Sequence, residues 1–237
     1  MAKQVKSKQR VADHGEVFTA EREVNAMLDL VKQETERIDS RFLEPACGDG
    51  NFLAEILRRK MAVVKANYRR NPADYEKYAV IAVTSIYGID ILQDNVEACQ
   101  ERLFGIWNEE YTANCKKEAN DECRETVRFI LRRNILCGNA LTLKQVDSQG
   151  KDTEQPIIFS EWSVVLGSTV KRRDFRLDVL MRENEDANQY DTQLSLFSDD
   201  TSGFDNWEVD PVTHQPIPKP IKEYPPTDYR RLKSYDE

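Results

Sequence analysis

The residues best suited to binding chemistry lie in residues 41–53, where a short apolar run ends in Glu44 and Pro45 and is followed by Gly48 and Gly50. Apolar residues then recur at helical spacing, which predicts a buried strand, a tight glycine turn and a helix start. Glycine allows positive φ and lets a ligand approach the backbone. The helix start adds free N–H groups and a partial positive charge. Because open parallel sheets bind ligands at the carboxyl ends of their strands, this turn is a candidate ligand cradle.

Two known glycine fingerprints do not fit this turn. Dinucleotide and P-loop sites need Gly-x-Gly-x-x-Gly or Gly-x-x-x-x-Gly-Lys-(Ser/Thr), whereas residues 48–53 lack the third glycine and no Lys-Ser/Thr follows. The sequence Glu-Pro-Ala-Cys-Gly-Asp-Gly-Asn-Phe-Leu (44–53) instead closely resembles the cofactor loop of S-adenosylmethionine-dependent DNA methyltransferases, especially the adenine-N6 class. An acidic loop also suits the ammonium and sulfonium of that cofactor better than it suits pyrophosphate. The resemblance implies a cradle formed by Glu44, Ala46, Gly48 and Gly50; an ordinary strand–turn–helix is the alternative.

Ahead of the loop, residues 14–19 have the sequence His-Gly-Glu-Val-Phe-Thr and lead into an amphipathic segment. Thr19 is a good N-cap, and an apolar stripe predicts a helix over about residues 20–36. Together these features resemble the N-terminal motif of the same methyltransferases, in which the Phe-Thr segment closes over the methionine end of the cofactor. The resemblance assigns this role to Phe18 and Thr19. The order of the motifs implies that a target-recognition part comes last.

Residues 78–90 are the most strand-like stretch of the chain, with β-branched and aromatic residues that end in Tyr-Gly-Ile-Asp. An acid at the tip of a neighbouring strand can accept the hydroxyls of a ribose. The alternative is an N-cap for a helix over residues 93–104. The tetrapeptide resembles the second motif of the family, which implies Asp90 at the ribose and Ile91 at the adenine. The spacing from Gly48 is longer than is usual in the family, so we expect an insertion or a second helix over residues 61–78.

Residues 133–141 predict a short strand that ends in Gly-Asn-Ala-Leu. Members of the family usually have Gly-Asp-Ala-Leu there, and the acid accepts the amino group of the cofactor's adenine. Asn139 departs from this pattern, although its side-chain oxygen can still accept a hydrogen bond. The resemblance therefore implies a contact from Asn139 to the cofactor, and a plain turn is the alternative.

The resemblance covers roughly residues 13–141 and then stops. The family predicts a later strand that ends in (Asp/Asn/Ser)-Pro-Pro-(Tyr/Phe/Trp), which holds the flipped base, and no such tetrapeptide is present. Pro225 and Pro226 lack the acid or amide before them and the aromatic residue after them, so we interpret them as linker. Catalytic residues therefore stay unassigned. Either a partner polypeptide supplies the catalytic strand, or the protein binds cofactor without transferring a methyl group, or the gene is a shortened remnant.

Composition narrows the class of protein. The five cysteines are widely spaced without a Cys-x-x-Cys pair, and the chain has two histidines. This pattern argues against a zinc site or a disulfide framework, and we expect no metal. Cys47 is expected to be a packing residue. No apolar run approaches the ~20 residues of a membrane span, and the N-terminus lacks a signal-peptide core. These features predict a soluble, cytoplasmic protein.

The net charge of −8 is unevenly distributed. Residues 183–237 hold 13 acids and five bases, whereas residues 1–182 hold 29 of each. The body has basic clusters, among them residues 58–60 and 171–173, which would suit either phosphate contact or a solvated face. The composition of the tail predicts disorder. The tail nevertheless contains one apolar cluster, formed by Gln193, Leu194, Leu196 and Phe197. This cluster resembles the Gln-Leu-x-Leu-Phe peptide by which bacterial replication proteins hold the sliding clamp. A segment that packs back onto the body is the alternative.

The sequence thus predicts an α/β protein with a doubly wound, Rossmann-like methyltransferase sheet that is incomplete at its C-terminal strands. Its organisation would be a basic arm (1–12), a cofactor-binding domain (13–182) and an acidic flexible tail (183–237). The resemblance implies a DNA adenine-N6 methyltransferase of a restriction–modification system, or its cofactor-binding subunit, in which the base's amino nitrogen attacks the sulfonium carbon directly. The alternative is a catalytically inactive binding protein that engages a partner subunit or the clamp.

Overall fold

The centre of the fold is a three-stranded parallel sheet with the order β1-β2-β3. In the computed structural model, which describes residues 10, 19–181, 207–209 and 216–236, these strands are β1 (Phe42–Glu44), β2 (Ile86–Asp90) and β3 (Ile135–Cys137). Glu44 lies opposite Gly88, and Asp90 lies opposite Cys137. The three strands therefore end at the same edge. The α/β class with a parallel sheet agrees with the sequence prediction.

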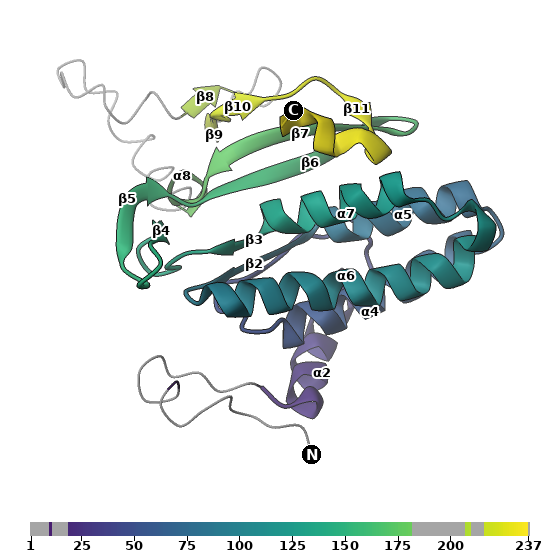
Figure 1. Cartoon of the computed structure of the whole chain (residues 1–237), viewed down its shortest axis with the longest axis horizontal. Helices are drawn as coiled ribbons and strands as arrows, with labels where there is room; N and C mark the ends of the chain where they lie inside the picture. Colours follow the sequence, from purple (N-terminus) through teal and green to yellow (C-terminus); the bar gives the residue numbers. More distant parts are fainter. Residues whose placement is uncertain (1–9, 11–18, 182–206, 210–215, 237) are drawn as a thin grey trace.

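Helices connect the strands and form most of the core (Figure 1). In chain order they are α2 (Glu21–Leu30), α3 (Lys32–Thr35), α4 (Asn51–Tyr68), α5 (Pro72–Thr84), α6 (Gln93–Cys115), η1 (Lys116–Glu118) and α7 (Asp121–Asn134). Helices α4 and α6 pack against the parallel strands as well as against each other. Each crossover from one strand to the next thus contains two helices rather than one.

One sequence prediction is wrong here, because the first half of the strand expected over residues 78–90 is helical. Helix α5 begins after Asn71, whose side chain accepts from the N–H of Ala73 at 3.2 Å, with Pro72 at the first helical position. Its second half is buried on nearly every side. A helix that is apolar all round carries no amphipathic period, so its sequence is easily mistaken for a buried strand. The extra helix is the insertion that the spacing predicted.

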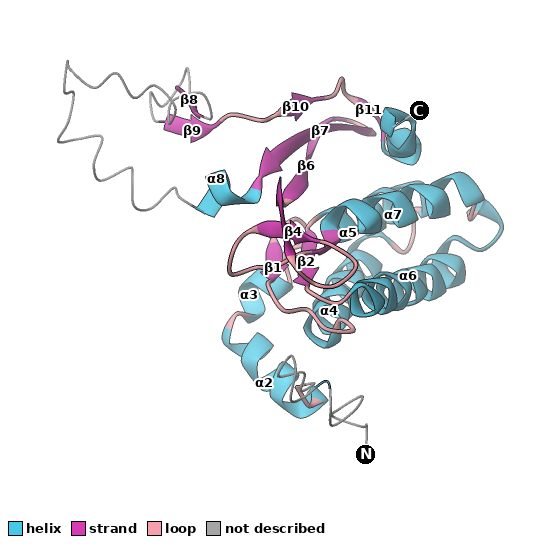
Figure 2. Cartoon of the chain, turned by 60° about the vertical axis from the view of Figure 1, so that its left-hand side comes forward, coloured by secondary structure: helices cyan, strands magenta, loops and turns pink. Residues whose placement is uncertain are grey.

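A second, antiparallel sheet follows in the chain and is built on the hairpin β6 (Ile158–Leu166) and β7 (Thr169–Arg176). Strands β10 (Lys222–Glu223) and β11 (Thr227–Asp228) pair with β7. Shorter elements complete the described chain: β4 (Lys144–Val146), β5 (Asp152–Pro156), α8 (Leu177–Met181), β8 (Trp207–Val209), β9 (Pro216–Pro218) and η3 (Tyr229–Asp236). Figure 2 shows the β6–β7 hairpin on one side of the parallel sheet and α4 and α6 on the other.

The two faces of the parallel sheet bury different partners. Ile86 belongs to the large helical core, and a Cβ at Gly88 would lie 2.9 Å from Leu53 of α4. Tyr87 points the other way, where its ring meets Phe159 of β6 edge-on and its hydroxyl donates to the Ser160 carbonyl at 3.0 Å. The alternation of side chains along β2 therefore separates a helical layer from a β layer.

Part of the tail that the sequence predicts to be flexible, residues 216–236, is packed against the body. Helix η3 packs on α7, with Tyr229 and Leu232 buried. Glu76 of α5 is 2 % exposed and accepts from the Tyr229 hydroxyl at 2.8 Å and from Arg230. Pro225 follows the buried Tyr224 in the connection between β10 and β11. The sequence prediction failed because Tyr and Leu anchors are few among charged residues, and their partners lie far away in the chain.

Candidate functional site

The glycine turn between β1 and α4 has the backbone geometry that its sequence predicts. Gly48 and Gly50 both have positive φ, 52° and 87°. A Cβ on Gly50 would lie 2.7 Å from the sulfur of Cys99, so the position has no room for a side chain. The turn is tied to the sheet because the Cys47 N–H donates to the Ile89 carbonyl at 2.9 Å. The loop is therefore held rigidly at the carboxyl end of β2.

Asp90 connects this loop to the next strand. One carboxylate oxygen, Oδ2, accepts from the Gly48 N–H at 2.9 Å. The other, Oδ1, accepts from the Leu92 N–H at 2.9 Å and from the Asn95 amide at 3.2 Å. The N-cap position of α6 is Leu92, without a side-chain cap, so Asp90 does not act as the N-cap that was the alternative prediction. Since each carboxylate oxygen has two lone pairs, Oδ2 keeps one acceptor position for a further donor.

Glu44 is the last residue of β1 and lies half-buried beside the turn. Burial raises the pKa of its carboxyl group, and a hydrogen bond from the Ala46 N–H acts in the opposite direction. Cys47 is buried, and the pKa of its thiol is raised by its contact with the Cys99 thiol and by burial. A protonated, buried thiol is a poor nucleophile, which agrees with the expected packing role of Cys47.

Asn139 follows β3 and lies near the end of β2, because the Gly138 N–H donates to the Asp90 carbonyl at 3.0 Å. Its side chain is engaged locally. The side-chain oxygen accepts from the Leu141 N–H at 3.0 Å, and the amide nitrogen donates to Asp152 at 2.9 Å. This geometry is that of an Asx turn. Ile91 lies beside it half-buried, with its carbonyl 3.6 Å from the Cys137 sulfur.

The segment ahead of α2 lies against the start of α4. The Thr19 carbonyl accepts from the Asn51 side chain at 3.3 Å. The prediction that Thr19 caps the helix is wrong: Ala20 occupies the N-cap position, without a side-chain cap. Phe18 lies outside the described residues. Thr19 therefore contacts the first residue of α4, next to the glycine turn, through its backbone carbonyl.

Sequence reasoning missed the side chain that braces the loop from outside. Arg102 of α6 donates to the Asn51 side chain at 2.7 Å and to the Asp49 carboxylate at 3.3 Å. The guanidinium comes from a helix that is more than 50 residues further along the chain. No local pattern signals such a contact, since only the packing of α6 against α4 brings the two together.

The basic clusters of the body serve mainly internal contacts. In residues 171–173, Arg172 is fully buried and pairs with Asp174 at 2.8 Å, while Arg173 pairs with Glu161 at 2.6 Å. In residues 58–60, Lys60 is buried and donates to the Ser85 hydroxyl at 2.7 Å and to two backbone carbonyls. These two clusters therefore fit neither of the predicted alternatives, a phosphate-binding face or a solvated face.

Comparison with known proteins bears on this arrangement. The family model described as "MmeI, DNA-methyltransferase domain" matches residues 16–167, more than half of the chain. The chain belongs to this family. Residues 16–167 contain β1 to β3, the glycine turn and the first strand of the hairpin, so the match covers the whole edge described above.

A curated relative supports the same assignment. "DNA methyltransferase A" of Bacillus subtilis (strain 168) is 24% identical over 145 residues, which are 59% of this chain and 16% of the relative. The chain thus spans a small part of the relative's length. No solved structure matches it. These matches confirm the predicted resemblance of the chain to the N-terminal part of a DNA methyltransferase.

Two further properties concern the described residues only. None of the helices there combines the length and the apolar composition of a membrane span. The same residues contain no group of three or more His, Cys, Asp or Glu side chains arranged to hold a metal ion.

Proposed function

We propose that this chain binds S-adenosylmethionine at the carboxyl edge of β1, β2 and β3 and serves as the cofactor-binding part of a DNA adenine-N6 methyltransferase of a restriction–modification system. The observation that carries the proposal is the convergence of an acid at the end of β1, a rigid glycine turn and an acid at the end of β2. The family match makes DNA the expected substrate.

The residues present suit the parts of this cofactor. The glycine turn, with positive φ at Gly48 and Gly50, would lie against the methionine part of the cofactor together with Ala46. Glu44 would hold the ammonium group, and its half-buried position strengthens an ion pair with a ligand. Phe18 and Thr19 would cover the methionine end. When bound, the cofactor supplies the activated methyl group; the chain's own residues bind and orient it.

At the nucleoside end, Asp90 would accept from the ribose. Because Oδ1 already has two donors, we expect one hydroxyl at Oδ2 and a second only if the Gly48 or Asn95 contact lengthens. Ile91 and Asn139 would lie at the adenine. Since the Asn139 oxygen is engaged by Leu141, this contact is the weakest of the set.

The catalytic strand would come from outside these 237 residues. No (Asp/Asn/Ser)-Pro-Pro-aromatic tetrapeptide occurs in the sequence, and β1 has no strand partner on the side away from β2 within the described residues. We therefore propose that residues 13–182 form the cofactor domain and that DNA recognition and methyl transfer require further polypeptide that carries the missing motif. Methyl transfer would then require more than these residues alone.

Calorimetric titration of S-adenosylmethionine into the purified chain tests the proposal. We expect a micromolar Kd, weakened about 100-fold or more in Asp90→Asn, which keeps the size of the side chain but loses its charge. Asp49→Asn is the matched control, because Asp49 lies on the same loop and faces Arg102. Equal affinity in all three proteins, or no binding by the folded wild type, would refute the proposed cofactor site.

A second candidate function is favoured by the missing tetrapeptide: a binding protein that transfers no methyl group and holds the sliding clamp through Gln193, Leu194, Leu196 and Phe197. These residues lie outside the described part of the chain. In this case Leu196→Ala with Phe197→Ala abolishes clamp binding without changing the melting temperature. An unchanged affinity for the clamp would exclude it.

A further inference from the structure

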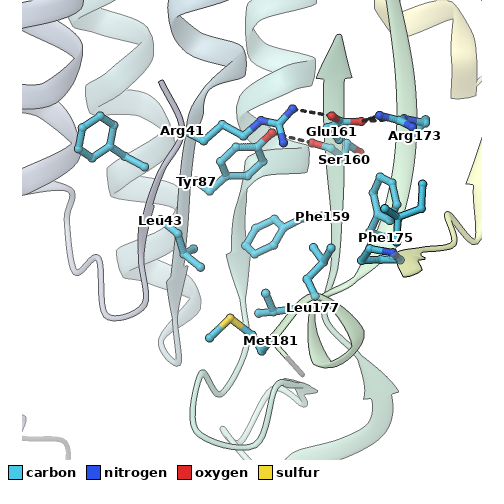
Figure 3. Close-up of a pocket in the computed structure, with 14 residues that line it drawn as sticks. Arg41, Leu43, Tyr87, Phe159, Ser160, Glu161, Arg173, Phe175, Leu177 and Met181 are labelled. Atoms are coloured by element: carbon cyan, nitrogen blue, oxygen red, sulfur yellow. Dashed lines mark hydrogen bonds and ion pairs between the residues drawn. The ribbon is translucent and has the colours of Figure 1, made fainter. Parts of the chain in front are cut away.

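A cavity lies between the parallel sheet and the β layer. Its volume is about 460 Å³, within the size range of pockets that take a small ligand. The side chains around it are mostly apolar, and Figure 3 shows them converging on the cavity: Leu43, Tyr87, Phe159, Phe175, Leu177 and Met181. Leu43 is 41% exposed and Met181 59% exposed. The cavity is thus apolar but open to solvent.

The cavity adjoins the free edge of β1. The Phe42 N–H donates to the Ser85 carbonyl at 2.9 Å, on the β2 side. Successive residues of a parallel strand direct their N–H and C=O groups to opposite sides, so those of Leu43 face away from β2. The described residues place no strand there. An open strand edge next to an apolar cavity is a template for a further strand with apolar side chains at every second position.

The chain itself carries a segment of this kind close by. Met181 lines the cavity, and so do Ile217 and Pro218, which belong to the part of the chain that follows residue 215. Between them lies the sequence Gln-Leu-Ser-Leu-Phe of residues 193–197. In an extended conformation Leu194 and Leu196 lie on one face. The 12 residues after Met181 span up to ~40 Å, so the segment can reach the cavity easily.

Charge favours the same pairing. Arg41 and Arg173 lie on the rim of the cavity, and both pair with the single carboxylate of Glu161 (Figure 3). The rim therefore has an excess of positive charge. Residues 193–197 have Asp191 on one side and Asp199 and Asp200 on the other. Opposite charges on a segment and its docking surface fix register and suppress wrong partners.

We propose that residues 193–197 of this same chain dock along the free edge of β1, with Leu194 and Leu196 in the cavity. The tether raises the effective concentration of the segment to the millimolar range. A segment that binds with a Kd of about 100 μM when separate is therefore about 90% docked when attached. A partner that takes the peptide, or a strand that takes the edge, must displace this contact. The inference does not depend on cofactor binding.

Hydrogen exchange of the full-length chain tests it from the side of the segment. In the wild type we expect the Leu43 amide to be protected, and to exchange about tenfold faster in Leu194→Asp/Leu196→Asp. Ser195→Asp is the matched control, because it adds a charge on the opposite face of the segment and leaves the exchange rate unchanged. None of these substitutions changes a residue of the described part of the chain.

Limited chymotrypsin digestion tests it from the side of the cavity. Leu43→Asp should release the segment and speed cleavage after Phe197 about tenfold, whereas Val165→Asp, at an exposed site on the hairpin outside the cavity, should not. Equal exchange and cleavage in all variants would overturn the proposal. Protection of Leu43 that is lost on dilution would also overturn it, because the occupant would then be a second copy of the chain.

Discussion

Different kinds of contact stabilise the carboxyl edge of the parallel sheet and the β6–β7 layer. At the edge, contacts made by backbone groups dominate: the Gly48 N–H donates to the Asp90 side chain, and the Gly138 N–H donates to the Asp90 carbonyl. In the β layer, side chains make the key contacts deep inside, and Arg172 lies fully buried against Asp174 with its guanidinium 4.3 Å from the centre of the Tyr224 ring. The edge is the site proposed for a ligand, whereas the buried ion pair of the β layer contributes to the stability of the fold.

This difference separates two kinds of mutational effect. Removing a buried ionic partner leaves an unpaired charge in a medium that solvates it poorly. Changing the glycine turn alters the backbone itself, with a smaller effect on folding and a larger one on a bound ligand.

The largest loss of stability is expected for Arg172→Met. The substitution leaves the buried carboxylate of Asp174 without its cation, although Ser160 and Tyr224 still donate to it at 2.7 and 3.3 Å. Breaking such a pair costs about 3–5 kcal/mol, measured as the free energy of unfolding in urea. Arg172→Met with Asp174→Leu should recover most of it, since no charge then stays buried. A loss below about 1 kcal/mol in the single variant would mean that water reaches this pair.

An intermediate effect is expected for Gly50→Ala. Positive φ and the close sulfur of Cys99 destabilise the folded protein by about 1–3 kcal/mol, and affinity for S-adenosylmethionine should fall at least tenfold because the loop must shift. The control is Gly105→Ala in α6, where a Cβ would meet nothing within 4 Å; there we expect a gain of about 0.5–1 kcal/mol. Equal affinities in the two variants would show that the turn does not contact the ligand.

The smallest effect is expected at Lys60, a buried cation near the amino ends of β1 and β2. Burial lowers the pKa of Lys60 from 10.5 to about 7. Between pH 7 and 8.5 the unfolded chain therefore binds more protons at this site than the folded one, and stability should rise with pH by about 1 kcal/mol per unit. Well below pH 7 Lys60 is protonated in both states and its contribution is constant. Lys60→Met should remove this slope from unfolding curves, and identical slopes in the two proteins would mean that the surrounding carbonyls keep the ammonium charged.

The sequence was sufficient for the edge because its signals are local. Gly48 and Gly50 have the positive φ that their positions in the turn predict, and the Tyr-Gly-Ile-Asp strand end lies beside them. Gly88 in that tetrapeptide has its own reason, since a Cβ there would lie 3.0 Å from the Cys47 sulfur. Whether the edge binds the predicted cofactor stays a prediction.

The errors occurred where packing decides the structure. Residues 78–84 are β-branched and apolar, yet they form a helix because Asn71 and Pro72 start one and the core surrounds it. Thr19 has a good capping side chain, but the helix starts one residue later and leaves it aside. The C-terminal segment has few apolar residues, and burial of Tyr229 and Leu232 against α7 depends on a surface that no local pattern reveals.

The buried carboxylate of Glu76 has a consequence for biosynthesis. Its partner Tyr229 is 153 residues further along the chain, so at 5–20 residues per second a ribosome makes it roughly 8–30 s later. During that interval α5 and α6 can assemble, and Tyr111 and Asn120 can donate to Oε2 of the carboxylate. Its other oxygen, Oε1, has its partners only in Tyr229 and Arg230 and must stay hydrated until they are made. Contacts of such long range slow folding in general. The growing polypeptide therefore passes through a period in which its helical core is present and still incomplete, and this is the stage at which a chaperone would bind it.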